Sequence, residues 1–69
     1  MMTKETIFKL RQELCMEQKE LAVLIGVSKQ SLWAYEKGVR NPSRPVVRKL
    51  MELVKKHKLK FKLEDFMNE

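Results

Sequence analysis

Apolar residues recur every three or four positions through most of the chain, which is the periodicity of a helix with one buried face. The first such segment runs from Thr6 to Leu14, with Thr3 or Thr6 available as its N-cap. The second runs from Glu17 to Ile25 and stops before Gly26, a residue favoured just after a helix because it tolerates positive φ. The pattern therefore predicts two short helices at the start of the chain.

A third helix is expected to follow after a very short turn. Ser28 is a preferred N-cap residue, and the segment Lys29 to Lys37 behind it stops before Gly38. The turn Gly26-Val27-Ser28 has the length of the turn in a helix-turn-helix. The sequence therefore predicts a helix-turn-helix over residues 17–37.

A loop that contains Asn41 and Pro42 comes next. The fourth predicted helix follows this loop and ends at about His57. Pro45 suits its first turn, where a missing N–H does no harm. Its apolar face consists of Val46, Val47, Leu50, Leu53 and Val54.

The C-terminal tail, residues 58–69, has a different pattern. Lys58 to Leu63 alternates polar and apolar residues, which is the periodicity of a strand, and LEDFMN behind it suits a single helical turn. One interpretation is an extended connector whose apolar residues close the core, namely Leu59, Phe61, Leu63 and Phe66. The other is an edge strand that pairs with its copy in a dimer. We favour the connector, because a lone short strand needs a partner.

Length and composition limit the chain to one small domain, residues 1–69. Of its 69 residues, 43% are hydrophobic, which is enough for one compact core. The net charge is +6, and it is unevenly placed, because residues 29–62 carry eleven basic and two acidic side chains, a net of +9, while residues 1–28 are neutral. A basic half favours a polyanionic partner, nucleic acid first and an anionic membrane surface second.

Several classes of function are excluded by what the sequence lacks. The single cysteine, Cys15, forms no internal disulfide and is expected to be a small buried hydrophobe in a reducing cytosol. His57 is too distant in sequence to activate it, and no cluster of Cys and His has the spacing of metal ligands. With no paired acid and base and no phosphate-binding loop, we expect no catalytic residue, no cofactor and no metal. No signal peptide or membrane span is evident, so we expect a cytoplasmic protein.

One side of the third helix carries side chains that suit recognition of DNA. At 100° per residue, the side opposite Leu32 and Tyr35 carries Lys29, Gln30, Trp33, Ala34 and Lys37. Gln pairs with adenine N6 and N7, Lys donates to guanine O6 and N7, and the major groove of B-DNA admits a helix. For the indole two interpretations stay open: contact with a thymine methyl, or packing against the loop 42–45.

The segment MEQKELAVLIGVSKQSLWAYEKG, Met16 to Gly38, resembles the helix-turn-helix of the Cro/C1 or XRE family of repressors. The resemblance extends over about residues 6–56 and includes Gln18 at the start of the second helix, Gly26 in the turn and Glu36-x-Gly38 at the end of the third helix. It implies an all-α, lambda-repressor-like domain of four or five helices that binds double-stranded DNA.

The resemblance also implies a role for individual residues. The residues that match base-contacting positions are Lys29, Gln30 and Ala34, to which the helix face adds Trp33. Those that match contacts to the DNA backbone are Gln18, Ser28, Lys37, Arg40 and Asn41. Arg11 and Glu36 match a partly buried salt bridge between the first and third helices.

The expected function is sequence-specific binding of DNA by a homodimeric repressor on an inverted-repeat operator, with no membrane involved. The lysine-rich HKLKFKL replaces the turn that commonly leads family members into a fifth helix, so the dimer interface stays open. One alternative is an antitoxin or an accessory protein of a mobile element that also binds a protein partner. The other is a protein-interaction module without DNA binding that uses Trp33, Phe61 and Phe66.

Overall fold

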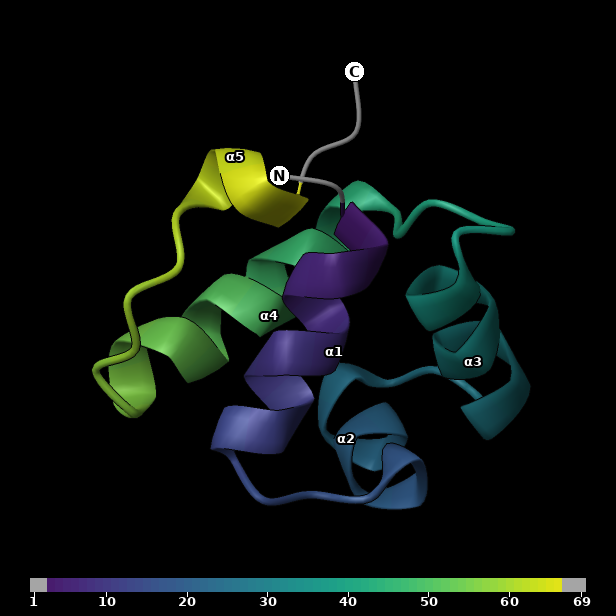
Figure 1. The fold of residues 1–69 in the computed structure, drawn as a ribbon, viewed down its shortest axis with the longest axis horizontal. Coiled ribbons are helices and arrows are strands. Elements are labelled where there is room, and N and C mark those ends of the chain that lie inside the picture. The colour runs from purple at the N-terminus through teal and green to yellow at the C-terminus, as the bar shows by residue number, and fades with distance from the viewer. Residues whose placement is uncertain (1–2, 67–69) are drawn as a thin grey trace.

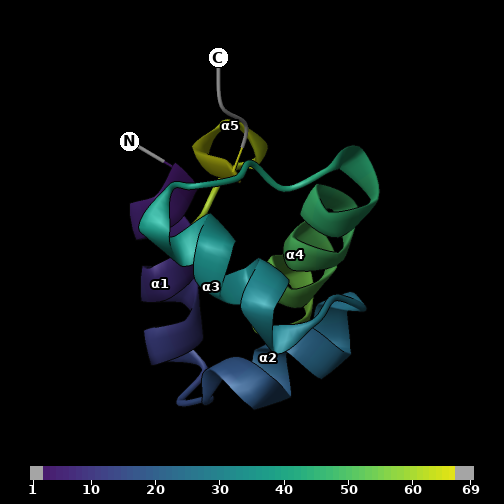
Figure 2. The ribbon, with the colours of Figure 1, turned by 90° about the vertical axis from the view of Figure 1, so that its right-hand side faces the viewer.

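Five helices make up the fold in a computed structural model that describes residues 3–66, with side chains from residue 5 onward (Figures 1 and 2). No strand occurs within the part of the chain that the structure describes. The all-α prediction is confirmed. The five helices are α1 (Thr3–Glu13), α2 (Gln18–Ile25), α3 (Lys29–Lys37), α4 (Arg44–Lys56) and α5 (Leu63–Phe66).

Helix α1 lies between the helix-turn-helix and the C-terminal tail and contacts both. It packs against α3 and against α5, while α2 packs against α3 and α4 (Figure 1). One core joins all five helices, so the helix-turn-helix and the tail share a single hydrophobic interior. Its fully buried aliphatic and aromatic side chains are Ile7, Leu10, Leu21, Leu32, Leu50 and Phe66.

The turn between α2 and α3 follows from its local sequence, as predicted. Gly26 has φ 74° and ψ 31°, the left-handed conformation that glycine adopts without a steric penalty. Next, the amide of Val27 donates to the carbonyl of Ala22 at 3.0 Å. The Ser28 side chain then accepts from the Ser31 amide at 3.0 Å and caps α3. Both helix boundaries at this turn are therefore fixed by neighbouring residues.

Helix α4 has the buried face that its periodicity predicted, since Val46, Val47, Leu50, Leu53 and Val54 are all buried. It begins at Arg44, with a proline in its first turn as expected. Its N-cap, Ser43, makes no side-chain capping bond, in contrast to Ser28.

Two expectations for the first helix are wrong. The helix already includes Thr3, and Thr6 is fully buried inside it, so Thr6 is no N-cap, while the side chain of Thr3 lies outside the described part. Cys15 is exposed instead of buried, because it lies in the turn to α2 with a left-handed φ of 54°. Its amide donates to the Gln12 carbonyl at 3.0 Å, which ends the helix without a glycine.

The tail is a connector in the single chain, where residues 58–62 form no strand. Pairing of this segment with its copy in a dimer stays a prediction. Leu59 and Phe61 pack on the core, and the ring of Phe66 is fully buried, 5.9 Å from that of Phe61 between centroids. Leu63 does not close the core as expected, since it is 53% exposed. Of the predicted turn LEDFMN, α5 covers residues 63–66, and residues 67–69 lie outside the described part.

Candidate nucleic-acid interface

Helix α3 presents most of its predicted recognition face to the surface. Leu32 and Tyr35 are buried, while Lys29, Gln30 and Lys37 are exposed. Ala34 differs from this pattern, because it is only 7% exposed. After Gly38 the chain turns back, and the amides of Val39 and Arg40 both donate to the Ala34 carbonyl, at 2.9 and 3.3 Å.

A shallow depression beside the N-terminal half of α3 gathers most of the residues that sequence reasoning selected. It is lined by Gln18, Ser28, Lys29, Gln30, Ser31, Trp33, Ala34 and Arg40. All four predicted base contacts and three of the predicted backbone contacts therefore line one concave surface, although they come from α2, the turn, α3 and the following loop. A concave surface at the start of a helix, with amide and cationic groups around it, is suited to the edge of a polyanion.

Two predicted backbone contacts lie outside this depression. Lys37 lines a second depression on the other side of Trp33, together with Glu5, Phe8 and Arg11. Asn41 is exposed in the loop that leads to α4. The predicted phosphate contacts are therefore distributed around the recognition helix and not confined to one pocket.

Trp33 lines both depressions, as Gln18 does, and it is 48% exposed. Residues 42–45 line neither depression. Half of a large aromatic side chain thus stays open to solvent between the two cationic groups of the helix, Lys29 and Lys37. Stacking or apolar contact with a base or sugar is the chemistry that this placement offers.

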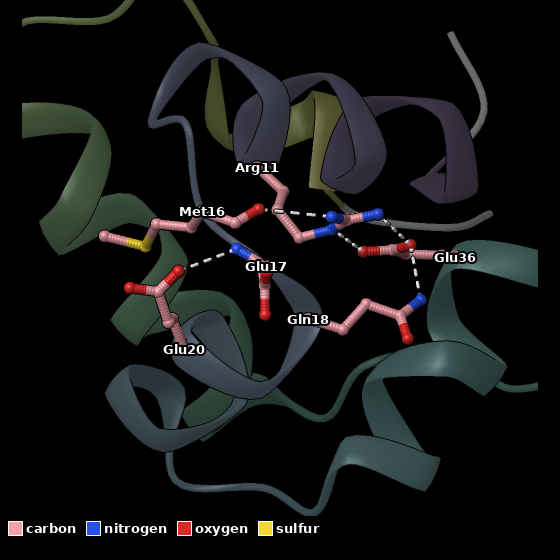
Figure 3. Close-up of polar contacts among 6 residues, drawn as sticks. All are labelled: Arg11, Met16, Glu17, Gln18, Glu20 and Glu36. Atoms are coloured by element: carbon pink, nitrogen blue, oxygen red, sulfur yellow. Dashed lines mark hydrogen bonds and ion pairs between the residues drawn. The ribbon is translucent and has the colours of Figure 1, made fainter.

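An ion pair ties the recognition helix to α1 (Figure 3). Arg11 Nε lies 2.7 Å from Glu36 Oε2, and Arg11 Nη2 donates to Glu36 Oε1 at 3.1 Å, so the contact is bidentate. Arg11 Nη1 also donates to the carbonyl oxygen of Met16 at 3.1 Å. With side chains 17% and 5% exposed, the pair is largely removed from water, and removing either member would leave the other charge uncompensated.

Gln18, the first residue of α2, extends this polar linkage toward the surface. Its Nε2 donates to Glu36 Oε1 at 3.0 Å, as Figure 3 shows. An amide NH₂ group has two donors, so one N–H remains for a phosphate oxygen. Glu36 therefore positions the side chain that the resemblance assigned to the DNA backbone.

The electrostatics of the surface follow from these contacts. Glu36 is compensated by Arg11, so its charge does not oppose an anion, whereas Lys29, Lys37 and Arg40 are exposed cations without an ion pair in the described structure. The N-terminus of α3 adds a partial positive charge of its own. The first depression, where Lys29 and Arg40 have no carboxylate beside them, attracts a polyanion, whereas the second also carries the carboxylate of Glu5.

Sequence reasoning missed three residues that belong to this region. Ser31 lines the first depression, and its Oγ lies 3.0 Å from Ser28 Oγ, a pairing that the i, i+3 spacing from the N-cap signals. Phe8 and Glu5 of α1 line the second depression beside Trp33. Phe8 is 42% exposed and lies under the Arg11 guanidinium, 5.3 Å from the ring centroid. The Arg11–Glu36 pair that the resemblance implied was the signal that could have found Phe8, since Phe8 lies three residues before Arg11 on α1.

The described residues contain neither a cluster of metal ligands nor a membrane-spanning helix. No group of three or more His, Cys, Asp or Glu side chains gathers there as metal ligands would. Over the same residues, none of the helices combines the length and the apolar character needed to cross a bilayer.

The fold and the surface of α3 together define a helix-turn-helix DNA-binding domain. A family model described as helix-turn-helix matches residues 7–59, which is most of the chain. The protein belongs to this family, in its Cro/C1 or XRE type, and is a DNA-binding regulator of transcription. Among curated proteins and among solved structures, no match to the chain was found.

Proposed function

We propose that this protein is a sequence-specific repressor that binds an inverted-repeat operator as a homodimer, on the nucleoid in the cytoplasm. The observation that carries the proposal is the gathering of Lys29, Gln30, Trp33 and Arg40 around one depression at the start of α3. In a two-fold dimer, two copies of α3 would enter successive major grooves about 34 Å apart, so the half-sites would lie about 10 bp from centre to centre.

Within this proposal, the residues divide into two groups. Lys29 and Gln30 read base edges from the first turn of α3, and Trp33 packs on the apolar surface of the neighbouring nucleotide. Ala34, because it is nearly buried, offers only a small methyl surface at the floor. Gln18, Ser28, Lys37, Arg40 and Asn41 hold the phosphate backbone and set the register.

The first experiment is selection of bound duplexes from a random library at roughly physiological salt, followed by sequencing of the bound pool. We expect an enriched inverted repeat with half-sites about one helical turn apart. Salt-sensitive binding without enrichment would contradict sequence-specific recognition. Complete absence of binding would favour the protein-interaction module, although Phe66, which that module would expose, is fully buried.

Substitutions then distinguish residues that recognise bases from residues that contact the phosphate backbone. Gln30→Ala should weaken binding to the selected site by about 1–3 kcal/mol and change binding to random duplex little, whereas Arg40→Ala should weaken both alike and lower the salt slope by about one. Gln12→Ala is the matched control, because Gln12 is an exposed glutamine on α1 that lines neither depression. An equal loss on both duplexes for Gln30→Ala would remove Gln30 from base recognition.

A further inference from the structure

A second surface, formed by α4 and α5, combines positive charge with apolar side chains. A groove between α4 and α5 is lined by Arg44, Val47, Arg48, Met51, Lys55 and Leu63. Figure 1 shows α5 and the C-terminal end of α4 on the side of the molecule away from α3. None of the residues that line this α4 groove lines either depression beside α3, so the groove is distinct from the surface described above.

The groove has the composition of a binding surface for an acidic, partly apolar helix. Arg44, Arg48, Met51 and Lys55 follow one another at four, three and four residues, so they form one stripe along α4. Leu63 beside them is 53% exposed, and the three cations have no ion pair within the described residues. A partner that supplied carboxylates at the edges and an apolar side chain in the middle would satisfy both.

Helix α2 of the same chain carries such a combination. Its outer stripe consists of Glu20 and Leu24, preceded by the N-cap residue Glu17, and all three are exposed, with Leu24 45% exposed. Neither carboxylate has an ion pair within the described residues, although Glu20 Oε1 accepts the N–H of Glu17 at 2.9 Å in the cap of α2. Figure 3 shows Glu20 pointing away from the Gln18–Glu36 side of the helix. None of the three residues lines either depression beside α3, and two carboxylates are repelled by phosphate, so this stripe is not a DNA contact.

The two stripes match in length and order. From Glu17 to Leu24 is seven residues, and from Arg44 to Met51 is also seven, so each spans about 10.5 Å at 1.5 Å per residue. With the helices parallel, Glu17 faces Arg44, Glu20 faces Arg48 and Leu24 faces Met51. We propose that the α2 stripe of one copy docks in the α4 groove of a second copy. Used reciprocally, this contact closes a two-fold dimer, which is the symmetry that an inverted repeat needs.

This proposal deepens the homodimer part of the proposed function, and its test contains no DNA. Sedimentation velocity over a concentration series should show reversible self-association that weakens as salt is raised. Glu17→Lys and Arg44→Glu should each weaken association about tenfold or more, because each places like charges opposite one another. An equimolar mixture of the two variants should recover association, since the introduced lysine of one variant then faces the introduced glutamate of the other.

Matched variants keep the result interpretable. Lys49→Glu makes the same charge change on α4 outside the groove and should leave association unchanged. Leu24→Ser tests the apolar contact without touching the N-terminus of α2, and should weaken association while the melting temperature stays close to that of the parent. A parent chain that stays monomeric, a mixture that does not recover, or an equal loss from Lys49→Glu would overturn the proposal. An enriched operator with a monomeric chain would overturn this contact alone.

Discussion

The helix-turn-helix and the C-terminal tail both pack on α1 through the shared hydrophobic core, and they differ in the contact that distinguishes each attachment. The helix-turn-helix is joined to α1 by a polar linkage, in which Arg11 binds Glu36 and Glu36 holds Gln18. The tail is joined by an aromatic side chain, Phe66, which is fully buried. The polar linkage fixes the direction of side chains at the surface, whereas the aromatic contact supplies mainly hydrophobic stabilisation.

The two regions also differ in how their ends are specified. Both helices of the helix-turn-helix are followed by a glycine with positive φ, Gly26 and Gly38, and Ser28 caps the second of them. In the C-terminal half of the chain, Ser43 before α4 makes no side-chain capping bond, and Lys58 at the start of the tail adopts φ 54° without being a glycine. The recognition segment is therefore specified locally, and the tail is held in place by its packing.

The largest effect is expected from removing the aromatic attachment of the tail. Phe66→Ala should lower the free energy of unfolding by about 4 kcal/mol, because it empties a fully buried site in a small core. Urea denaturation measures the change, and Leu63→Ala is the control, since Leu63 is 53% exposed in the same short helix. Equal losses from the two variants would show that the tail is not part of the core.

The next largest effect is expected from breaking the polar linkage. Arg11→Met should destabilise the fold by about 3 kcal/mol, because Glu36 is then left buried with only Gln18 as a partner. The double variant Arg11→Met/Glu36→Met should lose clearly less than the sum of the two single losses. Urea denaturation of all four proteins gives the coupling, and strict additivity would mean that the ion pair contributes nothing specific.

A smaller effect should separate the two serine caps. Ser28→Ala should cost about 1 kcal/mol, because the Ser31 amide loses its acceptor. Ser43→Ala should cost little, since Ser43 makes no side-chain capping bond. Thermal melting of both variants tests this difference, and a loss from Ser43→Ala that matched that of Ser28→Ala would contradict the contrast between the two regions.

The smallest effect is a gain of stability in the tail. Lys58→Gly should stabilise by about 0.5 kcal/mol, because relief of the left-handed conformation outweighs the added freedom of the unfolded chain. Lys60→Gly lies in the same connector without a positive φ and should be neutral or destabilising. If both glycines lowered the melting temperature, the conformation of Lys58 would not be costly.

This contrast explains how much of the structure could be predicted from the sequence. The bounds of α2 and α3 agree with the glycines and the N-cap serine, and the buried face of α4 agrees with its periodicity. The tail is harder to predict, because the alternation around Phe61 has the period of a strand, and only packing against α1 makes it a connector. Cys15 differs from its prediction for a related reason, since the position of a turn decides whether a small thiol is buried or exposed.

For the candidate site, the helical wheel of α3 is sufficient for Lys29, Gln30 and Trp33, whose exposure depends on that helix alone. It is not sufficient for Ala34, because the chain that returns after Gly38 is bonded to its carbonyl. Nor does it indicate Phe8, which α1 brings beside Trp33. The helical wheel of one helix predicts which of its own side chains are exposed, but not the contacts that distant segments make with them.

The position of Trp33 gives the protein an optical property. It is the one tryptophan in the sequence, and half of its indole is exposed between the two depressions of the recognition surface. Its fluorescence emission therefore comes from the place where a duplex would lie, and no second indole in the chain adds a background to it. The native chain, without a dye or a tag, carries its own reporter of whatever occupies that surface.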